Sequence, residues 1–310
     1  MNKVNYKNKT IEFVKVQFAY KSSEPGKQVD PITFCDILEH ENTPILKYRI
    51  PNEKWQQLTI LENTSEYIIG VIITTSISGI PPKHNFESNK TKKIDLEESE
   101  GLGFANVFLY YKTKKVLLYE FNRNGCYLSA LKEFLKYIVG HIYKDKHITL
   151  EWLPILKRDI YETYQKMRVY QQVEYVVANP THMIAQKEKS DQDNKALIAI
   201  TNEAKDLNAE SVQIVYKGDT KAGGLTPKKL WGIVGDLYSK SMTQKLVVSG
   251  YLEDNENKKI QHLDLLNGAL KGNMKLKEPK VLQSLLLAER TDGITKVFKD
   301  AQNELDSILK

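Results

Sequence analysis

The sequence has few of the residues that build disulfide frameworks or metal centres. Only Cys35 and Cys126 occur among the 310 residues, which argues against disulfide staples and against a zinc site built from thiols. The six histidines are scattered, and none stands in a His-x-His or His-Glu-x-x-His spacing. We expect two reduced, buried thiols, no metal and no cofactor.

Long apolar runs are also missing. The longest, near residues 67–75, is far too short to cross a bilayer, and the first ten residues have no apolar core typical of a secretion signal. We therefore expect a cytoplasmic protein without membrane insertion. A content of 41% hydrophobic and 27% charged residues is typical of a soluble globular chain with one large or two ordinary domains.

The charge balance is mildly basic, with 45 basic and 39 acidic residues and a net charge of +6. The two signs are interspersed over most of the length. This pattern permits binding of nucleic acid through phosphate neutralisation, although a solvated surface gives the same counts.

Alternating apolar and polar residues predict a strand-rich first half, and the segment 104–137 is its clearest part. Two apolar runs form a hairpin over 104–122, and leucines at three- and four-residue spacing then predict a helix over 128–139. Residues 81–101 have few apolar side chains, so we expect a long mobile loop there, with a binding loop as the alternative. Further strands are expected at 11–20, 55–61, 67–78, 147–153 and 169–178, with short helices at 32–40 and 155–167.

The second half alternates helices and strands, and the polar stretch 181–195 separates the two patterns. Helices are expected at 195–207, 227–240 and after Val281, and strands at 211–217 and 245–252. We therefore predict an α+β protein: a strand-rich domain over 1–180 with the mobile loop, then a smaller α/β domain over 181–310 with C-terminal helices.

The best local candidate for anion binding is the segment 217–229, KGDTKAGGLTPKK. A predicted strand ends here, a glycine loop follows, and Thr226-Pro227 starts a helix, so backbone N–H groups and Lys221, Lys228 and Lys229 could meet phosphate. The Walker spacing is not met, which disfavours nucleotide hydrolysis. A plain flexible loop before a well-capped helix is the alternative.

Basic and aromatic residues interleave between 157 and 175, where Arg158, Arg168 and Tyr164 could contact phosphates and stack on bases. The alternative is core packing, because several of the apolar residues keep helical spacing. Arg123, in the turn before the predicted helix at 128, is a further binding candidate because the fold gives it no evident task.

Two catalytic hypotheses can be stated from the sequence. A metal-dependent nuclease would use Asp264 with Glu278 and Lys280, but Pro279 inside that Glu-x-Lys breaks the strand such a site requires. Cys126 stands at the start of a helix, which could favour its thiolate, although a small buried residue gives the same pattern. We expect no catalytic residues, and the chain is more easily explained as a binding protein.

The run 116–135, VLLYEFNRNGCYLSALKEFL, resembles uncharacterised bacterial proteins found near phage-defence or mobile-element genes. In those proteins a strand ends in an acidic, aromatic and Asn triplet before a glycine turn and a helix. Glu120-Phe121-Asn122 and Gly125 match, while Cys126 replaces the usual proline. The resemblance implies a non-enzymatic component of an antiphage-defence or mobile-element system. It would bind nucleic acid or a partner protein from the same operon; a nuclease or a structural, oligomeric subunit are the alternatives.

Overall fold

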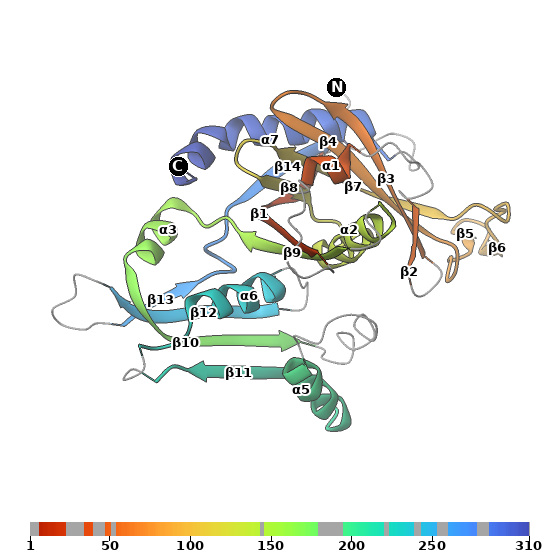
Figure 1. Ribbon diagram of the computed structural model, residues 1–310. Coiled ribbons are helices and arrows are strands. Elements are labelled where there is room, and N and C mark those ends of the chain that lie inside the picture. Colours follow the sequence, from red (N-terminus) through yellow and green to blue (C-terminus); the bar gives the residue numbers. More distant parts are fainter. Residues whose placement is uncertain are drawn as a thin grey trace. The chain divides into compact units, whose positions relative to one another are not determined.

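The computed structural model describes residues 6–22, 34–39, 47–50, 54–142, 146–178, 195–219, 223–238, 243–252, 260–277 and 285–309. The chain forms two compact units: Met1–Glu151 together with Lys271–Lys310, and Trp152–Leu270 (Figure 1). No helix in the described part of the chain is both long and apolar enough to span a membrane.

A large sheet organises the first unit, and its neighbouring strands from β14 to β2 pair in antiparallel fashion. The strand order is β14-β1-β8-β7-β4-β3-β2, and β9 also pairs with β1. The strands are β1 (Tyr6–Ser22), β2 (Lys47–Ile50), β3 (Lys54–Asn63), β4 (Tyr67–Ser76), β7 (Leu102–Tyr111), β8 (Val116–Glu120), β9 (Lys146–Pro154) and β14 (Lys271–Lys277). The last strand of the sheet in sequence, β14, therefore lies beside the first.

Helices cover both faces of this sheet. They are α1 (Phe34–Leu38), α2 (Leu128–Ile142) and α7 (Leu287–Ile308). Adjacent residues of β7 show the division, because successive side chains of a strand point to opposite faces. The Tyr110 ring packs against Phe34 of α1 at 4.7 Å between centroids, whereas Tyr111 packs against Phe298 of α7 at 4.9 Å. Since α1 contacts α2, these two helices share one face and α7 covers the other.

The connection between β4 and β7 carries its own small hairpin, formed by β5 (Lys83–Asn85) and β6 (Lys90–Lys92). The segment 81–101, for which the sequence predicts a long mobile loop, therefore contains two short paired strands. All residues from 81 to 93 are nevertheless exposed, because the segment has little apolar surface to bury. In Figure 1 the hairpin extends beyond the end of the large sheet of its unit.

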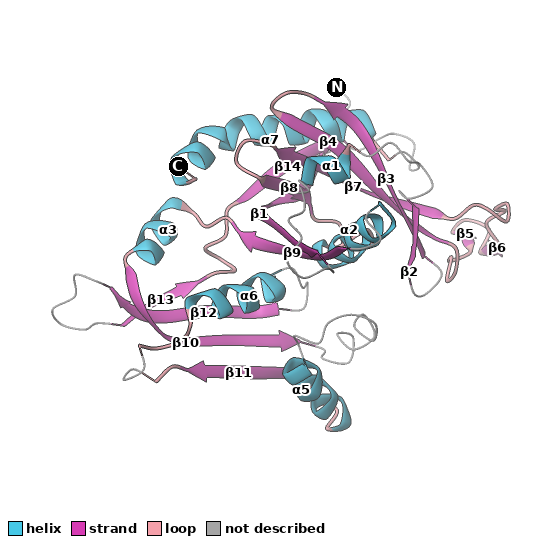
Figure 2. Cartoon of the chain, in the orientation of Figure 1, coloured by secondary structure: helices cyan, strands magenta, loops and turns pink. Residues whose placement is uncertain are grey.

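The second unit is built on a four-stranded antiparallel sheet in the order β11-β10-β12-β13 (Figure 2). One face forms a core with α6, in which Val173 and Val248 of the sheet pack with Val234 of the helix. The elements of this unit are α3 (Arg158–Gln165), β10 (Met167–Ala178), α5 (Lys195–Asp206), β11 (Ser211–Lys217), α6 (Pro227–Tyr238), β12 (Thr243–Leu252) and β13 (Ile260–Asp264).

The fold is α+β, as the sequence predicts, and most expected helices and strands are present within a few residues. The domain bounds differ from the predicted 1–180 and 181–310. The chain passes into the second unit at Trp152 and returns to the first at Lys271, so β14 and α7 belong with the N-terminal strands. The predicted boundary at 181–195 lies almost wholly outside the described residues.

Candidate nucleic-acid interface

The predicted anion loop between β11 and α6 forms the expected strand, loop and helix. Gly223 and Gly224 both have φ of 86°, a left-handed conformation that favours glycine. However, the N–H of Gly224 donates to the Asp219 carbonyl at 2.8 Å, and the N–H of Leu225 donates to the Tyr170 carbonyl at 2.7 Å. These two donors hold the loop itself, so they do not face an anion.

The lysines predicted for that loop are only partly described. Lys229 is exposed at the start of α6. Lys221 and the side chain of Lys228 lie outside the described part of the structure. Phosphate binding at this loop therefore stays a prediction.

The aromatic and basic residues between 157 and 175 divide between the core and the surface of the second unit. The Tyr164 ring packs edge-on against Trp231 at 4.7 Å and lies 6.0 Å from Tyr170, so it belongs to the core of the second unit. Arg158 forms an exposed ion pair with Glu162 at 2.9 Å. Arg168 is exposed on β10. The stacking role predicted for Tyr164 is not supported, because its ring is already packed.

Arg123 lies in a turn, and Asp264 ends β13 at the start of another turn. Arg123 is exposed in the first unit, and its carbonyl accepts a hydrogen bond from the Tyr127 hydroxyl at 2.7 Å. The Asp264 carboxylate accepts hydrogen bonds from the N–H groups of Leu266 and Asn267 at 3.0 and 3.1 Å. These contacts are typical of an aspartate that stabilises a turn. Glu278 and Lys280 lie outside the described residues, so the nuclease hypothesis stays a prediction. Within the described ranges, no group of three metal-binding side chains lies together.

The β5–β6 hairpin, which we call the basic hairpin (residues 83–92), forms for local reasons. The Asn85 side-chain oxygen accepts from the N–H groups of Glu87 and Ser88 at 3.0 and 2.8 Å, which closes an Asx turn. Asn89 has a φ of 51°, a conformation that asparagine tolerates better than most residues. Asn85 and Asn89, which lie at the two ends of the turn between the three-residue strands, are the sequence signal for this hairpin. A prediction from apolar content alone does not detect it.

The register of the basic hairpin places three lysines together. Lys83 lies directly opposite Lys92, and Asn85 lies opposite Lys90. Because alternate residues share a face, Lys83, Lys90 and Lys92 all project from one side, which we call the lysine face. The other side carries His84 and Thr91, which are 3.1 Å apart between ring nitrogen and hydroxyl oxygen.

The lysine face has no local compensation among the residues that the structure describes. No ion pair involves Lys83, Lys90 or Lys92 there, and the hairpin contains a single acidic residue, Glu87. Like charges directly opposite each other on paired strands destabilise the pairing. The arrangement is therefore unfavourable for the hairpin itself, and it concentrates positive charge where solvent and ligands can reach it.

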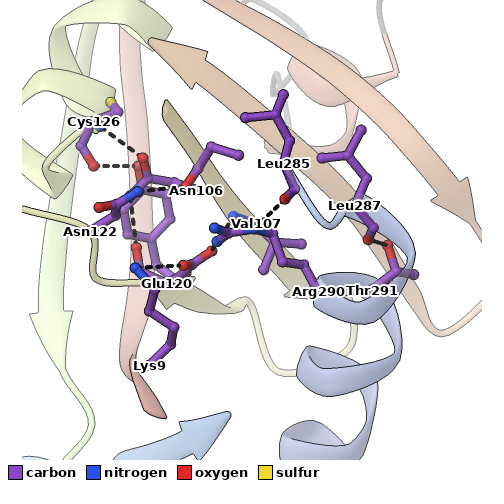
Figure 3. Close-up of polar contacts among 12 residues, drawn as sticks. Lys9, Asn106, Val107, Glu120, Asn122, Cys126, Leu285, Leu287, Arg290 and Thr291 are labelled. Atoms are coloured by element: carbon purple, nitrogen blue, oxygen red, sulfur yellow. Dashed lines mark hydrogen bonds and ion pairs between the residues drawn. The ribbon is translucent and has the colours of Figure 1, made fainter. Parts of the chain in front are cut away.

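Apart from the basic hairpin, the first unit contains a buried ion pair between Glu120 and Arg290, which has a structural role (Figure 3). The Glu120 carboxylate at the end of β8 is fully buried and accepts a hydrogen bond from Arg290 in the first turn of α7. It also accepts from the Val107 N–H at 3.1 Å, and the Lys9 ammonium lies 3.6 Å from its other oxygen. Burial lowers the pKa of Lys9, an effect that the nearby Glu120 partly offsets. The buried pair ties the C-terminal helix to the N-terminal strands.

The same region explains the segment 116–135. Asn106 donates to the Glu120 carbonyl and accepts from the Cys126 N–H, both at 2.8 Å (Figure 3). A Cβ at Gly125 would lie 2.0 Å from the Asn106 oxygen, so glycine is required. Proline in place of Cys126 would remove the donated N–H. Burial raises the pKa of the Cys126 thiol to about 12, which agrees with a buried residue and not with a reactive thiolate.

Comparison with known proteins gives one informative result. A comparison with curated proteins finds no match to the sequence. The model of a family of unknown function, DUF6731, matches residues 36–284, a range that contains the basic hairpin and the second unit. Because this match covers most of the sequence, the chain belongs to the DUF6731 family.

Proposed function

We propose that the protein binds nucleic acid through the basic hairpin. The observation that carries this proposal is the lysine face, where Lys83, Lys90 and Lys92 project together. A polyanion that neutralises them relieves the repulsion between Lys83 and Lys92 and releases its own counterions. Lys229 and Arg168, which are exposed on the second unit, are separate candidates for phosphate binding.

We place this binding in a non-enzymatic cytoplasmic component of an antiphage-defence or mobile-element system. The support is the resemblance of 116–135 to proteins of such loci, and the family match itself has no assigned function. A partner protein from the same operon is the competing ligand. An acidic protein surface could also meet three lysines, and the binding experiment separates it from nucleic acid.

The test neutralises the lysine face without disturbing the fold. A Lys83→Gln, Lys90→Gln, Lys92→Gln triple variant removes three exposed charges and also removes the repulsion between opposite strands. The matched control is Lys275→Gln, Lys277→Gln, Lys299→Gln, which removes the same charge from exposed positions on β14 and α7. Fluorescence anisotropy with a labelled 20-nucleotide strand, at several salt concentrations, measures the affinity of each protein.

We expect the hairpin variant to bind about tenfold more weakly at low salt, and the control to bind like the wild type. The slope of log K against log salt should become shallower by about 2, since each lost phosphate contact on a single strand removes about 0.7. Equal losses in the two triple variants would mean that net charge alone drives binding and would refute the hairpin as the site. Absence of binding by the wild type would reject the proposal.

A further inference from the structure

The tip of the basic hairpin exposes a large aromatic ring. Phe86 is 86% exposed, more than any other large hydrophobic residue in the described part of the chain. It directly follows Asn85, which starts the turn, and no ring contact is found for it among the described residues. The Phe86 ring therefore adds little buried apolar surface to the folded protein, and it lies in the turn next to the lysine face.

We infer that Phe86 stacks on an unpaired base of a single-stranded nucleic acid whose phosphates contact the lysine face. This inference rests on the proposed function and names its substrate class. Positive charge that follows the backbone, combined with an aromatic ring that accepts any base, is the usual means of binding single strands without sequence preference. The three paired positions of each strand extend over about 10 Å, which suits a few nucleotides.

Two features favour a single strand over a duplex. Bases in a duplex are already stacked on both sides, so an inserted ring must first separate them, and proteins that do this recover the free energy by bending DNA over a wide surface. Here four acidic residues follow the hairpin in the chain: Asp95, Glu97, Glu98 and Glu100. All four are exposed, and their charge would repel a second phosphate backbone that ran along this segment, whereas a flexible single strand could turn away from them.

The experiment separates stacking from phosphate contact. Full-length wild type, Phe86→Ala and Phe86→Trp are titrated against four labelled probes of equal length: oligo-dT, oligo-rU, an abasic strand with the same phosphates, and a duplex. Leu207→Ala is the control, because Leu207 is also a large exposed apolar residue, at 73%, and lies on the second unit. All three variants alter exposed side chains, so none should change the fold.

We expect the wild type and Phe86→Trp to bind dT or rU about tenfold more tightly than the abasic strand, and Phe86→Ala to bind all single strands equally weakly. Leu207→Ala should behave as the wild type. If Phe86→Ala keeps full affinity for dT while the lysine variant loses it, the stacking inference is wrong and the proposed function stands. A Phe86→Ala loss as large on the duplex as on dT also overturns the preference for unpaired bases. If the wild type binds no probe, both proposals fail.

Discussion

Replacing Arg290 with methionine measures how strongly the buried ion pair holds α7 on the sheet. Arg290 is 8% exposed and Glu120 is not exposed at all, so the change leaves a buried carboxylate with only Lys9, at 3.6 Å, to compensate its charge. Removing one partner of a buried pair costs about 3–5 kcal/mol. The variant also loses the hydrogen bond from the Arg290 Nε to the Leu285 carbonyl at 2.7 Å.

We therefore expect Arg290→Met to lower the free energy of unfolding of the first unit by about 3–4 kcal/mol. The lower part of the general range applies because the Lys9 ammonium still compensates part of the Glu120 charge. For a unit of this size the melting temperature should fall by roughly 10 °C. Urea denaturation followed by circular dichroism gives the free energy, and amide exchange in α7 shows whether this helix opens first.

Two variants make the result decisive. Arg158→Met breaks an exposed Arg–Glu pair of the same chemistry and should cost no more than about 0.5 kcal/mol. A Glu120→Gln, Arg290→Met double variant removes both charges and should recover much of the lost stability, because the remaining amide oxygen can still accept from Val107. If Arg290→Met is as stable as Arg158→Met, the buried pair does not hold the helix.

Two further perturbations test the first unit. Burial raises the pKa of Glu12 from 4.5 to about 7, so the folded protein binds this proton more tightly than the unfolded chain does. The free energy of unfolding should therefore decrease as the pH rises from about 4.5 to 7. Glu12→Gln should remove this fall and be more stable than the wild type at pH 8 by roughly 1–3 kcal/mol in urea titrations; equal pH slopes would contradict the explanation. Gly125→Ala should destabilise the unit by about 2–3 kcal/mol, because the Asn106 oxygen that its Cβ meets is held by the Cys126 N–H. Wild-type melting behaviour in this variant would show that Asn106 can move aside.

The local elements were predictable because their signals are local. The hairpin of β7 and β8, with the helix α2 after it, follows from alternation and then from leucines at helical spacing, and the burial of Leu131, Phe134 and Leu135 confirms the predicted stripe. The basic hairpin was missed because its strands have three residues each and no apolar side chain. Its stability comes from turn chemistry at Asn85 and Asn89, which a search for hydrophobic periodicity does not detect.

The candidate site shows the same limit. Charge and aromatic character mark binding candidates in a sequence, but the fold decides their roles: Tyr164 packs in a core, and Asp264 closes a turn. Lys83 and Lys92 are nine positions apart, so only the strand register reveals that they oppose each other. Exposure of Phe86 likewise cannot be read from a sequence, since a phenylalanine is more often buried.

The α+β class and the approximate bounds of most helices and strands follow from the amino-acid sequence, because side-chain periodicity and turn residues act within a few positions of the chain. Which elements pack into the same unit depends instead on contacts made in the folded chain. The return of β14 and α7 to the first unit depends on contacts such as Arg290 with Glu120, 170 residues apart. Such contacts are selected by burial and complementary charge across the whole fold, and those forces leave no periodic pattern along the chain.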